Sequence, residues 1–168
     1  MIHEVSGDLL TYGADIICHQ ANFYGVMGGG VALSIWNKLL DDNTRYAYQD
    51  LCCKQGRRLL GSVQSLPFTY ASGAPGEVFN LFCQDDRAQP DGSITRYDCM
   101  YSCLKYVEEY AKLHSGKRRQ LSVALPGYMG CGIACGDWPT VREIIEEVFS
   151  NSPISCTIVY LDRRMKCD

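Results

Sequence analysis

Two glycine-rich stretches are the features of this sequence that could do chemistry. Three consecutive glycines, residues 28–30, stand between a buried-looking strand that ends near His19 and an apolar helix. A second stretch, PGYMGCGIACGDW (126–138), follows another apolar strand and also precedes a helix. Glycine lets backbone N–H groups approach an anion closely, and a helix N-terminus adds a favourable dipole. Together the two loops could grip a diphosphate from both sides, although each alone could be a tight turn.

Neither stretch matches a common nucleotide-binding motif. GxxxxGK[ST] is absent, and the contiguous glycines at 28–30 do not form GxGxxG. A nucleotide-binding α/β domain of some other kind is one of three functional hypotheses for the chain.

Several polar side chains fall on or near the predicted cleft and could assist proton transfer. A histidine changes charge near neutral pH, so His19 is a plausible acid or base, although it could equally be a structural residue at a strand end. Asn22 could be a turn residue, Asp137 a helix cap, and Asp85 part of a solvated turn. The full set is His19, Asn22, Gln84, Asp85, Asp86 and Asp137.

Length and composition indicate one ordinary soluble domain over residues 1–168. Hydrophobic residues make up 46% of the chain and charged residues 21%, with a net charge of −3. This charge gives no sign of a surface that coats a polyanion, and Lys117-Arg118-Arg119 is typical of a solvated loop. No apolar run is long enough to cross a membrane, and the N-terminus does not resemble a signal peptide. We expect a cytoplasmic monomer without a membrane partner.

The ten cysteines are expected to be reduced and mostly unreactive. Cys18, Cys83 and Cys156 lie in apolar runs, where cysteine behaves as a small hydrophobic residue. The sequence has no pair of CxxC knuckles, and its three histidines are scattered. We therefore expect no zinc site and no other metal or cofactor.

Strand-like and helix-like segments alternate along the chain. The pattern predicts strands at 1–5, 14–19, 62–66, 78–83, 121–125 and 156–161, and helices at 29–40, 43–55, 95–114 and 138–149. Ser93 or Thr95 could cap the third helix and Gly116 could end it, whereas Asp137 could cap the fourth. This alternation predicts a three-layer α/β/α sandwich with a mixed, mostly parallel sheet. Ligands bind such sheets beyond the carboxyl ends of the strands, where both glycine loops are expected.

The order GDLL, ADIICHQAN, GGGVA and PGYMGCGIACGDW resembles the macro domain family over essentially the whole chain. Within this family, the sequence most resembles the branch that contains the terminal ADP-ribose protein glycohydrolases and the ADP-ribose-1″-phosphate phosphatases. The resemblance implies that the chain binds ADP-ribose, free or attached to a macromolecule. It also implies that residues 28–30 and their neighbours wrap the diphosphate and the distal ribose.

The resemblance implies a role for individual residues. Asp8 would accept a hydrogen bond from the adenine amino group, although it could also be a helix N-cap. Asn22 would bind the distal ribose hydroxyls, and Tyr160 could flank the adenine or belong to the core. Main-chain N–H groups of the second loop would bind phosphate, so Cys131 is expected to be a packing residue. The implied ligand-binding set is Asp8, Leu9, Ala21, Asn22, Gly28, Gly29, Gly30, Val31, Gly130, Cys131, Gly132, Ile133, Ala134 and Tyr160.

The chain departs from this branch at its catalytic positions. Asp85 stands where the glycohydrolases carry a lysine, Ala134 where they carry an aspartate, and His19 at the first position of the asparagine motif. A lysine adduct is therefore not expected. The remaining candidates for catalysis are Asn22, His19, Asp85 and Asp137. They favour hydrolysis of an ADP-ribosyl ester, an O-acyl-ADP-ribose or ADP-ribose-1″-phosphate, with a non-catalytic ADP-ribose reader as the alternative.

Overall fold

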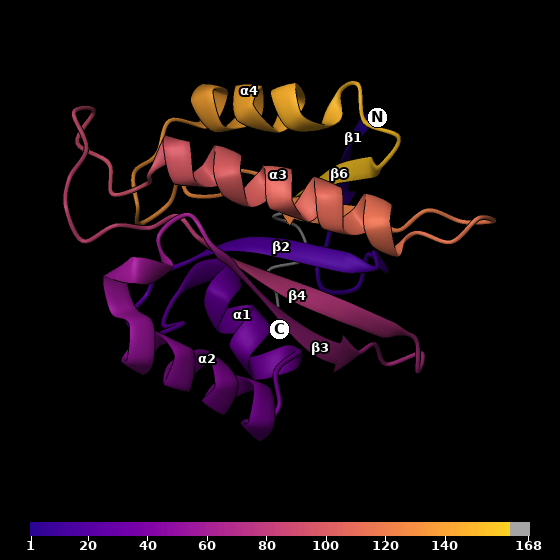
Figure 1. Ribbon diagram of the computed structural model, residues 1–168, viewed down its shortest axis with the longest axis horizontal. Helices are drawn as coiled ribbons and strands as arrows, with labels where there is room; N and C mark the ends of the chain where they lie inside the picture. Colours follow the sequence, from indigo (N-terminus) through magenta and orange to yellow (C-terminus); the bar gives the residue numbers. More distant parts are fainter. Residues whose placement is uncertain (162–168) are drawn as a thin grey trace.

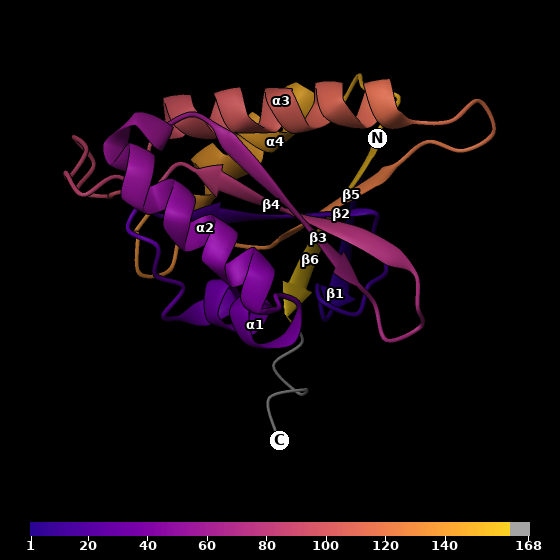
Figure 2. The same cartoon turned by 60° about the horizontal axis from the view of Figure 1, so that its bottom comes forward.

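A six-stranded sheet with the order β1-β6-β5-β2-β4-β3 forms the middle layer of the protein (Figure 1). The structure is a computed structural model that describes residues 1–161. The strands β1, β6, β5, β2 and β4 run parallel, and β3 pairs antiparallel with β4. Helices α1 and α2 cover one face, and α3 and α4 cover the other (Figures 1 and 2). The predicted three-layer sandwich with a mixed, mostly parallel sheet is confirmed.

Each predicted strand and helix is present, with boundaries that move by a few residues. The strands are β1 (Ile2–Gly7), β2 (Ile16–Ala21), β3 (Val63–Thr69), β4 (Pro75–Phe82), β5 (Ser122–Pro126) and β6 (Ser155–Leu161). The helices are α1 (Gly30–Lys38), α2 (Asp42–Gln55), α3 (Tyr97–His114) and α4 (Trp138–Phe149), with a short 3-10 helix η1 (Gly56–Leu59) after α2. The end of the expected domain, residues 162–168, lies outside the described residues. None of the helices within 1–161 is long and apolar enough to span a membrane.

The central strand β2 is buried on both faces, and its alternation sends neighbouring side chains into different cores. Ile16 and Cys18 belong to the hydrophobic cluster beneath α3 and α4, whereas Ile17 and Ala21 belong to the cluster beneath α1 and α2. His19 therefore faces the layer of α1 and α2, and the next residue along the strand faces α3 and α4.

The predicted cap at the start of α3 is wrong, and the predicted cap of α4 is confirmed. The N-cap of α3 is Arg96, without a side-chain cap, and the Thr95 hydroxyl donates instead to the Gly130 carbonyl. This helix ends at His114 with Ser115 as its C-cap, so Gly116 stands directly after the cap. The Asp137 side chain caps α4, as predicted.

Candidate functional site

A cavity of about 290 Å³ lies where the carboxyl ends of β2, β4 and β5 meet the two glycine loops. This is the edge at which parallel α/β sheets bind ligands. A larger hollow of about 480 Å³ lies elsewhere and includes neither glycine loop. The smaller cavity is therefore the better candidate site. Its lining is His19, Gln20, Gly29, Gly30, Val31, Ala32, Gln84, Pro126, Gly127, Tyr128, Met129, Gly130, Gly132, Ile133 and Ala134.

The first glycine loop forms the N-terminus of α1. Gly29 is the N-cap and lacks a side-chain hydrogen bond to the first turn. The amide groups of that turn have no partner within the helix, so they are available to an anion beside Gly30 and Val31. Gly30 has φ of +55°, a conformation that favours glycine. Gly29 is extended, so the left-handed residue of this loop is Gly30.

The second loop is held in place by side chains that the sequence analysis did not assign. The Gly130 carbonyl accepts hydrogen bonds from Thr95 Oγ1 over 2.6 Å and from the Gly136 amide over 2.9 Å. Gln20 Nε2 donates to Thr95 Oγ1 over 3.1 Å. Gly130 has φ of +74°, and a Cβ there would lie 2.7 Å from Gln20 Oε1. A glycine is therefore required at position 130, with Gln20 and Thr95 as its supports.

The two loops meet across the mouth of the cavity. Ile133 is 84% exposed, yet its Cδ1 lies 3.2 Å from the point that a Cβ on Gly29 would occupy. The absence of a side chain at Gly29 therefore lets the second loop approach the first. The main-chain groups of both loops face one narrow space, as a bound diphosphate requires.

His19 forms part of the floor of this cavity and is 2% exposed. Its Nε2 lies 2.6 Å from Asn80 Oδ1. Burial lowers the pKa of His19 to about 4, against which the hydrogen bond to Asn80 acts only in part. The imidazole is therefore neutral at pH 7. The neutral ring can accept a proton or a hydrogen bond, but it does not act as a general acid at this pH.

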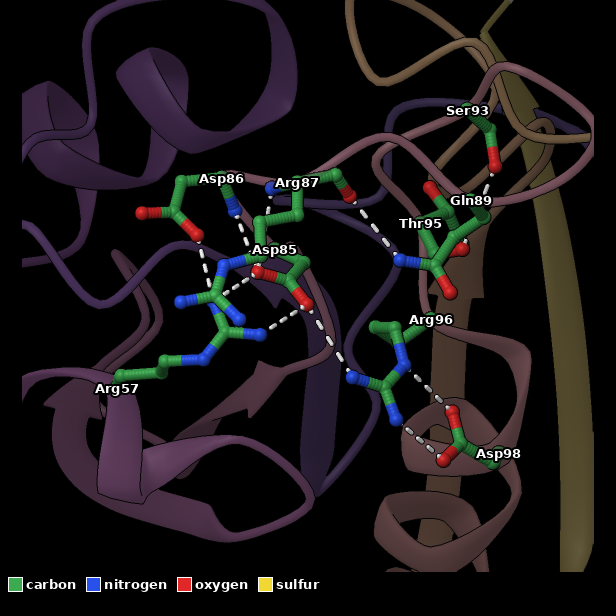
Figure 3. A network of polar contacts seen from close by, with 9 residues as sticks. All are labelled: Arg57, Asp85, Asp86, Arg87, Gln89, Ser93, Thr95, Arg96 and Asp98. Atoms are coloured by element: carbon green, nitrogen blue, oxygen red, sulfur yellow. Dashed lines mark hydrogen bonds and ion pairs between the residues drawn. The ribbon is translucent and has the colours of Figure 1, made fainter.

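Asp85 is buried at the centre of an ion-pair network outside the cavity lining (Figure 3). Arg57 binds both of its carboxylate oxygens, and Arg96 Nη1 donates to Oδ2 over 3.2 Å. Burial raises the pKa of Asp85, but the hydrogen bonds from Arg57 and Arg96 outweigh it and hold the pKa well below its usual range. The carboxylate is permanently charged and tied, whereas its neighbour Gln84 lines the cavity.

Asp137 and Asn22 have structural contacts and do not line the cavity. Asp137 Oδ2 accepts from the Thr140 amide over 3.1 Å, as the cap of α4. Asn22 Oδ1 accepts from the Tyr24 amide and from the Tyr48 hydroxyl, both over 3.0 Å. The Asn22 amide nitrogen donates to the Val26 carbonyl over 2.8 Å, which leaves its second hydrogen for another acceptor.

The residues implied for the adenine also lie outside the cavity lining. Asp8 Oδ1 accepts from the Leu10 amide over 2.9 Å, and Asp8 borders the larger hollow. Leu9 is buried in the core beneath α1 and α2. The Tyr160 hydroxyl donates to Glu4 over 3.1 Å, and its ring packs edge-on to Tyr128, which does line the cavity. An aromatic wall therefore borders one end of the site.

Cys131 is half-buried, and burial raises the pKa of its thiol to about 11. Its Sγ lies 3.3 Å from the Met129 carbonyl, to which the thiol donates. These contacts fit a packing residue and not a nucleophile, which must be a thiolate. Within residues 1–161, no group of three or more His, Cys, Asp and Glu side chains is arranged to hold a metal ion.

Comparison with known proteins shows which proteins the chain is similar to. No family model matches the chain. It is 29% identical over 153 residues to a DNA ADP-ribosyl glycohydrolase of Thermus aquaticus, which covers 88% of this chain but only 37% of that protein. It is 25% identical over 171 residues to an ADP-ribose 1″-phosphate phosphatase of Candida glabrata, covering 87% of this chain and 92% of the relative.

A solved structure shares both the sequence order and the fold. The macrodomain of Thermus aquaticus DarG matches with a TM-score of 0.70 and 25% identity, over 95% of this chain and 97% of that one. The chain has the macro domain fold. Both glycine loops line the cavity, and Ala134 is 5% exposed at its edge. Among residues 1–161, the lining includes neither a lysine nor a carboxylate.

Proposed function

We propose that this macro domain binds ADP-ribose, free or attached to a macromolecule, and hydrolyses an ADP-ribose derivative. The observation that carries the proposal is the meeting of two glycine loops over one cavity. Gly29 and Gly30 of the first loop and Gly130 and Gly132 of the second all line this cavity, so main chain without side chains borders it on both sides. Such amides bind diphosphate without needing a basic side chain. This fits a chain whose net charge is −3.

The names of the relatives support a substrate of this class. One acts on ADP-ribosylated DNA and the other on ADP-ribose 1″-phosphate, and both substrates contain ADP-ribose with a group attached. The chain spans little more than a third of the first relative, so the carrier of the ADP-ribose is open for this protein. We infer an ADP-ribosyl ester, an O-acyl-ADP-ribose or ADP-ribose-1″-phosphate as the substrate class.

The proposed reaction uses water and no covalent adduct with the protein. In an ADP-ribosyl ester or ADP-ribose-1″-phosphate, the water oxygen bonds to the anomeric carbon of the distal ribose and the bond from that carbon to the leaving oxygen breaks. One water proton passes to an acceptor, and the carboxylate or phosphate departs as an anion. In an O-acyl-ADP-ribose, the water oxygen bonds to the acyl carbon, the bond from that carbon to the ribose oxygen breaks, and the ribose oxygen takes up a proton as the carboxylic acid is released. Because Asp85 and Asp137 are engaged elsewhere, the acceptors beside the cavity are His19 and the diphosphate of the ligand. Asn22 would orient the ribose with its remaining amide hydrogen.

A non-catalytic ADP-ribose reader is the second candidate. One observation favours it, namely that the lining within residues 1–161 includes no carboxylate to activate water. A reader needs only the loop amides and the cavity. The two candidates share the ligand and differ in turnover.

Turnover assays separate the two candidates. The wild-type protein is incubated with glutamyl-ADP-ribose ester, O-acetyl-ADP-ribose and ADP-ribose-1″-phosphate, and the release of ADP-ribose is followed. We expect release from at least one substrate, and no protein-bound adduct after borohydride treatment. An adduct would contradict the water mechanism. Tight binding of ADP-ribose without release from any substrate would favour the reader.

We further infer a zinc-free monomer with reduced cysteines, as in the cytoplasm. Nine cysteines within residues 1–161 are free thiols. Size-exclusion chromatography with light scattering checks the monomer, and elemental analysis checks for zinc. Alkylation of the native protein should label the exposed Cys53 and Cys135 first. Several disulfides in protein purified without an oxidant would contradict the inference.

A further inference from the structure

A row of polar side chains crosses the core beneath α1 and α2. His19 on β2 contacts Asn80 on β4, Asn80 Nδ2 donates to Gln64 Oε1 over 3.1 Å, and Gln64 Nε2 donates to the Ala47 carbonyl over 3.3 Å. His19 is 2% exposed, and Asn80 has no exposed surface. Burying such groups costs free energy unless they are hydrogen-bonded. The row therefore calls for an explanation beyond packing.

The direction of each hydrogen bond in this row follows from the last contact, between Gln64 and the Ala47 carbonyl. The carbonyl of Ala47 can only accept, so the amide nitrogen of Gln64 must face it. Gln64 then presents its oxygen to Asn80, and Asn80 presents its own oxygen to His19. An oxygen acceptor 2.6 Å from Nε2 requires a proton on Nε2. In a neutral imidazole, the other nitrogen then carries a lone pair.

Within residues 1–161, that lone pair has no hydrogen-bond partner. His19 Nδ1 is buried and accepts no hydrogen bond from residues 1–161. The His19 ring is nevertheless part of the cavity lining, between the two glycine loops and Gln84. A buried acceptor without a partner is rare in native proteins and often marks a site where a ligand or water supplies the donor. The cavity is the place from which such a donor can come.

We propose that Gln64 and Asn80 are positioning residues that hold His19 as the Nε2-protonated tautomer, so that Nδ1 accepts a hydrogen bond from a hydroxyl group of the bound nucleotide. The contact with the ligand rests on the proposed function, whereas the tautomer does not. Nδ1 is buried, so the contact requires a small shift of the ring or of its neighbours. The sugar hydroxyls of ADP-ribose are donors of the required kind.

Long-range ¹H–¹⁵N correlation spectra of the imidazole rings test the proposal directly. His19 is assigned by comparison with His19→Asn. In the ligand-free wild type at pH 7, we expect a proton on Nε2 and none on Nδ1. Saturating ADP-ribose should move the Nδ1 resonance in the direction of a nitrogen that accepts a hydrogen bond. A proton on Nδ1 in the ligand-free protein, or an unmoved Nδ1 resonance in the saturated complex, would overturn the proposal.

Two substitutions of Gln64 test the row. Gln64→Met removes the acceptor for Asn80, so the Asn80 amide can turn its nitrogen toward His19 and the proton can move to Nδ1. We expect a mixture of tautomers and ADP-ribose binding about 3- to 10-fold weaker, the loss of one hydrogen bond. Gln64→Glu keeps an acceptor for Asn80 and should retain the wild-type tautomer.

Thermal melts of both variants are the control for folding. A folded Gln64→Met protein with the wild-type tautomer and affinity would contradict the role of the row. No binding of ADP-ribose by the wild type would instead contradict the proposed function, and the ligand-free spectra would still decide the tautomer.

Discussion

Arg57 Nη2 donates to Asp85 Oδ2 over 2.8 Å, and this pair joins η1 to the loop that follows β4. Arg96 at the start of α3 binds the same oxygen, so one buried carboxylate connects three segments (Figure 3). The loop between β4 and α3 includes both Gln84 and Thr95. Asp85 therefore supports the wall of the cavity from behind.

Asp85→Ala should lower the free energy of unfolding by about 3 kcal/mol, because it leaves two arginines without their buried partner. Asp86→Ala is the matched control, since it also binds Arg57 but its side chain is 43% exposed, against 1% for Asp85. Asp86→Ala should lower the free energy of unfolding by less than about 1 kcal/mol. Urea unfolding measures the free energy of unfolding of both variants. An Asp85→Ala protein of wild-type stability that has lost turnover would assign Asp85 to the chemistry.

Asp137→Ala should lower the free energy of unfolding by about 1 kcal/mol, the usual cost of losing an N-cap. The physical reason is the lost bond to the Thr140 amide at the start of α4. Turnover per folded molecule should stay unchanged. Denaturation and initial rates are measured on the same preparation, and a lost rate at wild-type stability would show that Asp137 is catalytic.

The buried imidazole of His19 should make the protein sensitive to mild acid. Its pKa falls from 6.5 to about 4 on folding, so between these values the unfolded state binds the proton and the folded state does not. Stability contributed by the neutral ring is therefore present above pH 6.5 and is lost as the pH falls toward 4. From pH 7 to pH 5, wild type should lose about 2 kcal/mol relative to His19→Asn. Parallel pH series of urea unfolding check this, and identical slopes for the two proteins would contradict it.

Gly130→Ala should disrupt the second loop, whereas Gly132→Ala should not. An added Cβ at 130 would lie 2.7 Å from Gln20 Oε1 at a φ of +74°, and one at 132 would meet nothing within 4 Å. We expect the first variant to bind ADP-ribose at least about 10-fold more weakly, a loss of about 1.4 kcal/mol. We expect Gly132→Ala to fold normally, so a change in its affinity for ADP-ribose would come only from the methyl group added in the cavity. Equal affinity of Gly130→Ala and wild type would place the ligand elsewhere.

The strands, helices and glycine loops could be predicted because their signals are local. Apolar periodicity marks β2 and α3, and contiguous glycines before an apolar helix mark a loop that binds through its backbone. The sequence could not show which glycine needs a left-handed backbone, because the choice of Gly30 over Gly29 depends on the entry angle of α1.

The environments of the polar side chains could not be predicted because their partners are distant in the chain. Asp85 is neutralised by Arg57, 28 residues before it, and Gln20 reaches Thr95, 75 residues after it. The relation of His19 to Asn80 likewise depends on the pairing of β2 with β4. The contacts of Asp85 and Asp137, two aspartates that looked available for chemistry, are therefore visible only in the structure.

Calorimetric titration of the wild-type protein with ADP-ribose and with AMP tests the central claim most directly. The two glycine loops are expected to grip the diphosphate and distal ribose, which AMP lacks. We predict that ADP-ribose binds at least about 100-fold more tightly than AMP, a difference of about 2.8 kcal/mol from the added contacts. Equal affinity for the two nucleotides, or no heat of binding with ADP-ribose, would contradict the claim that the loops form an ADP-ribose site.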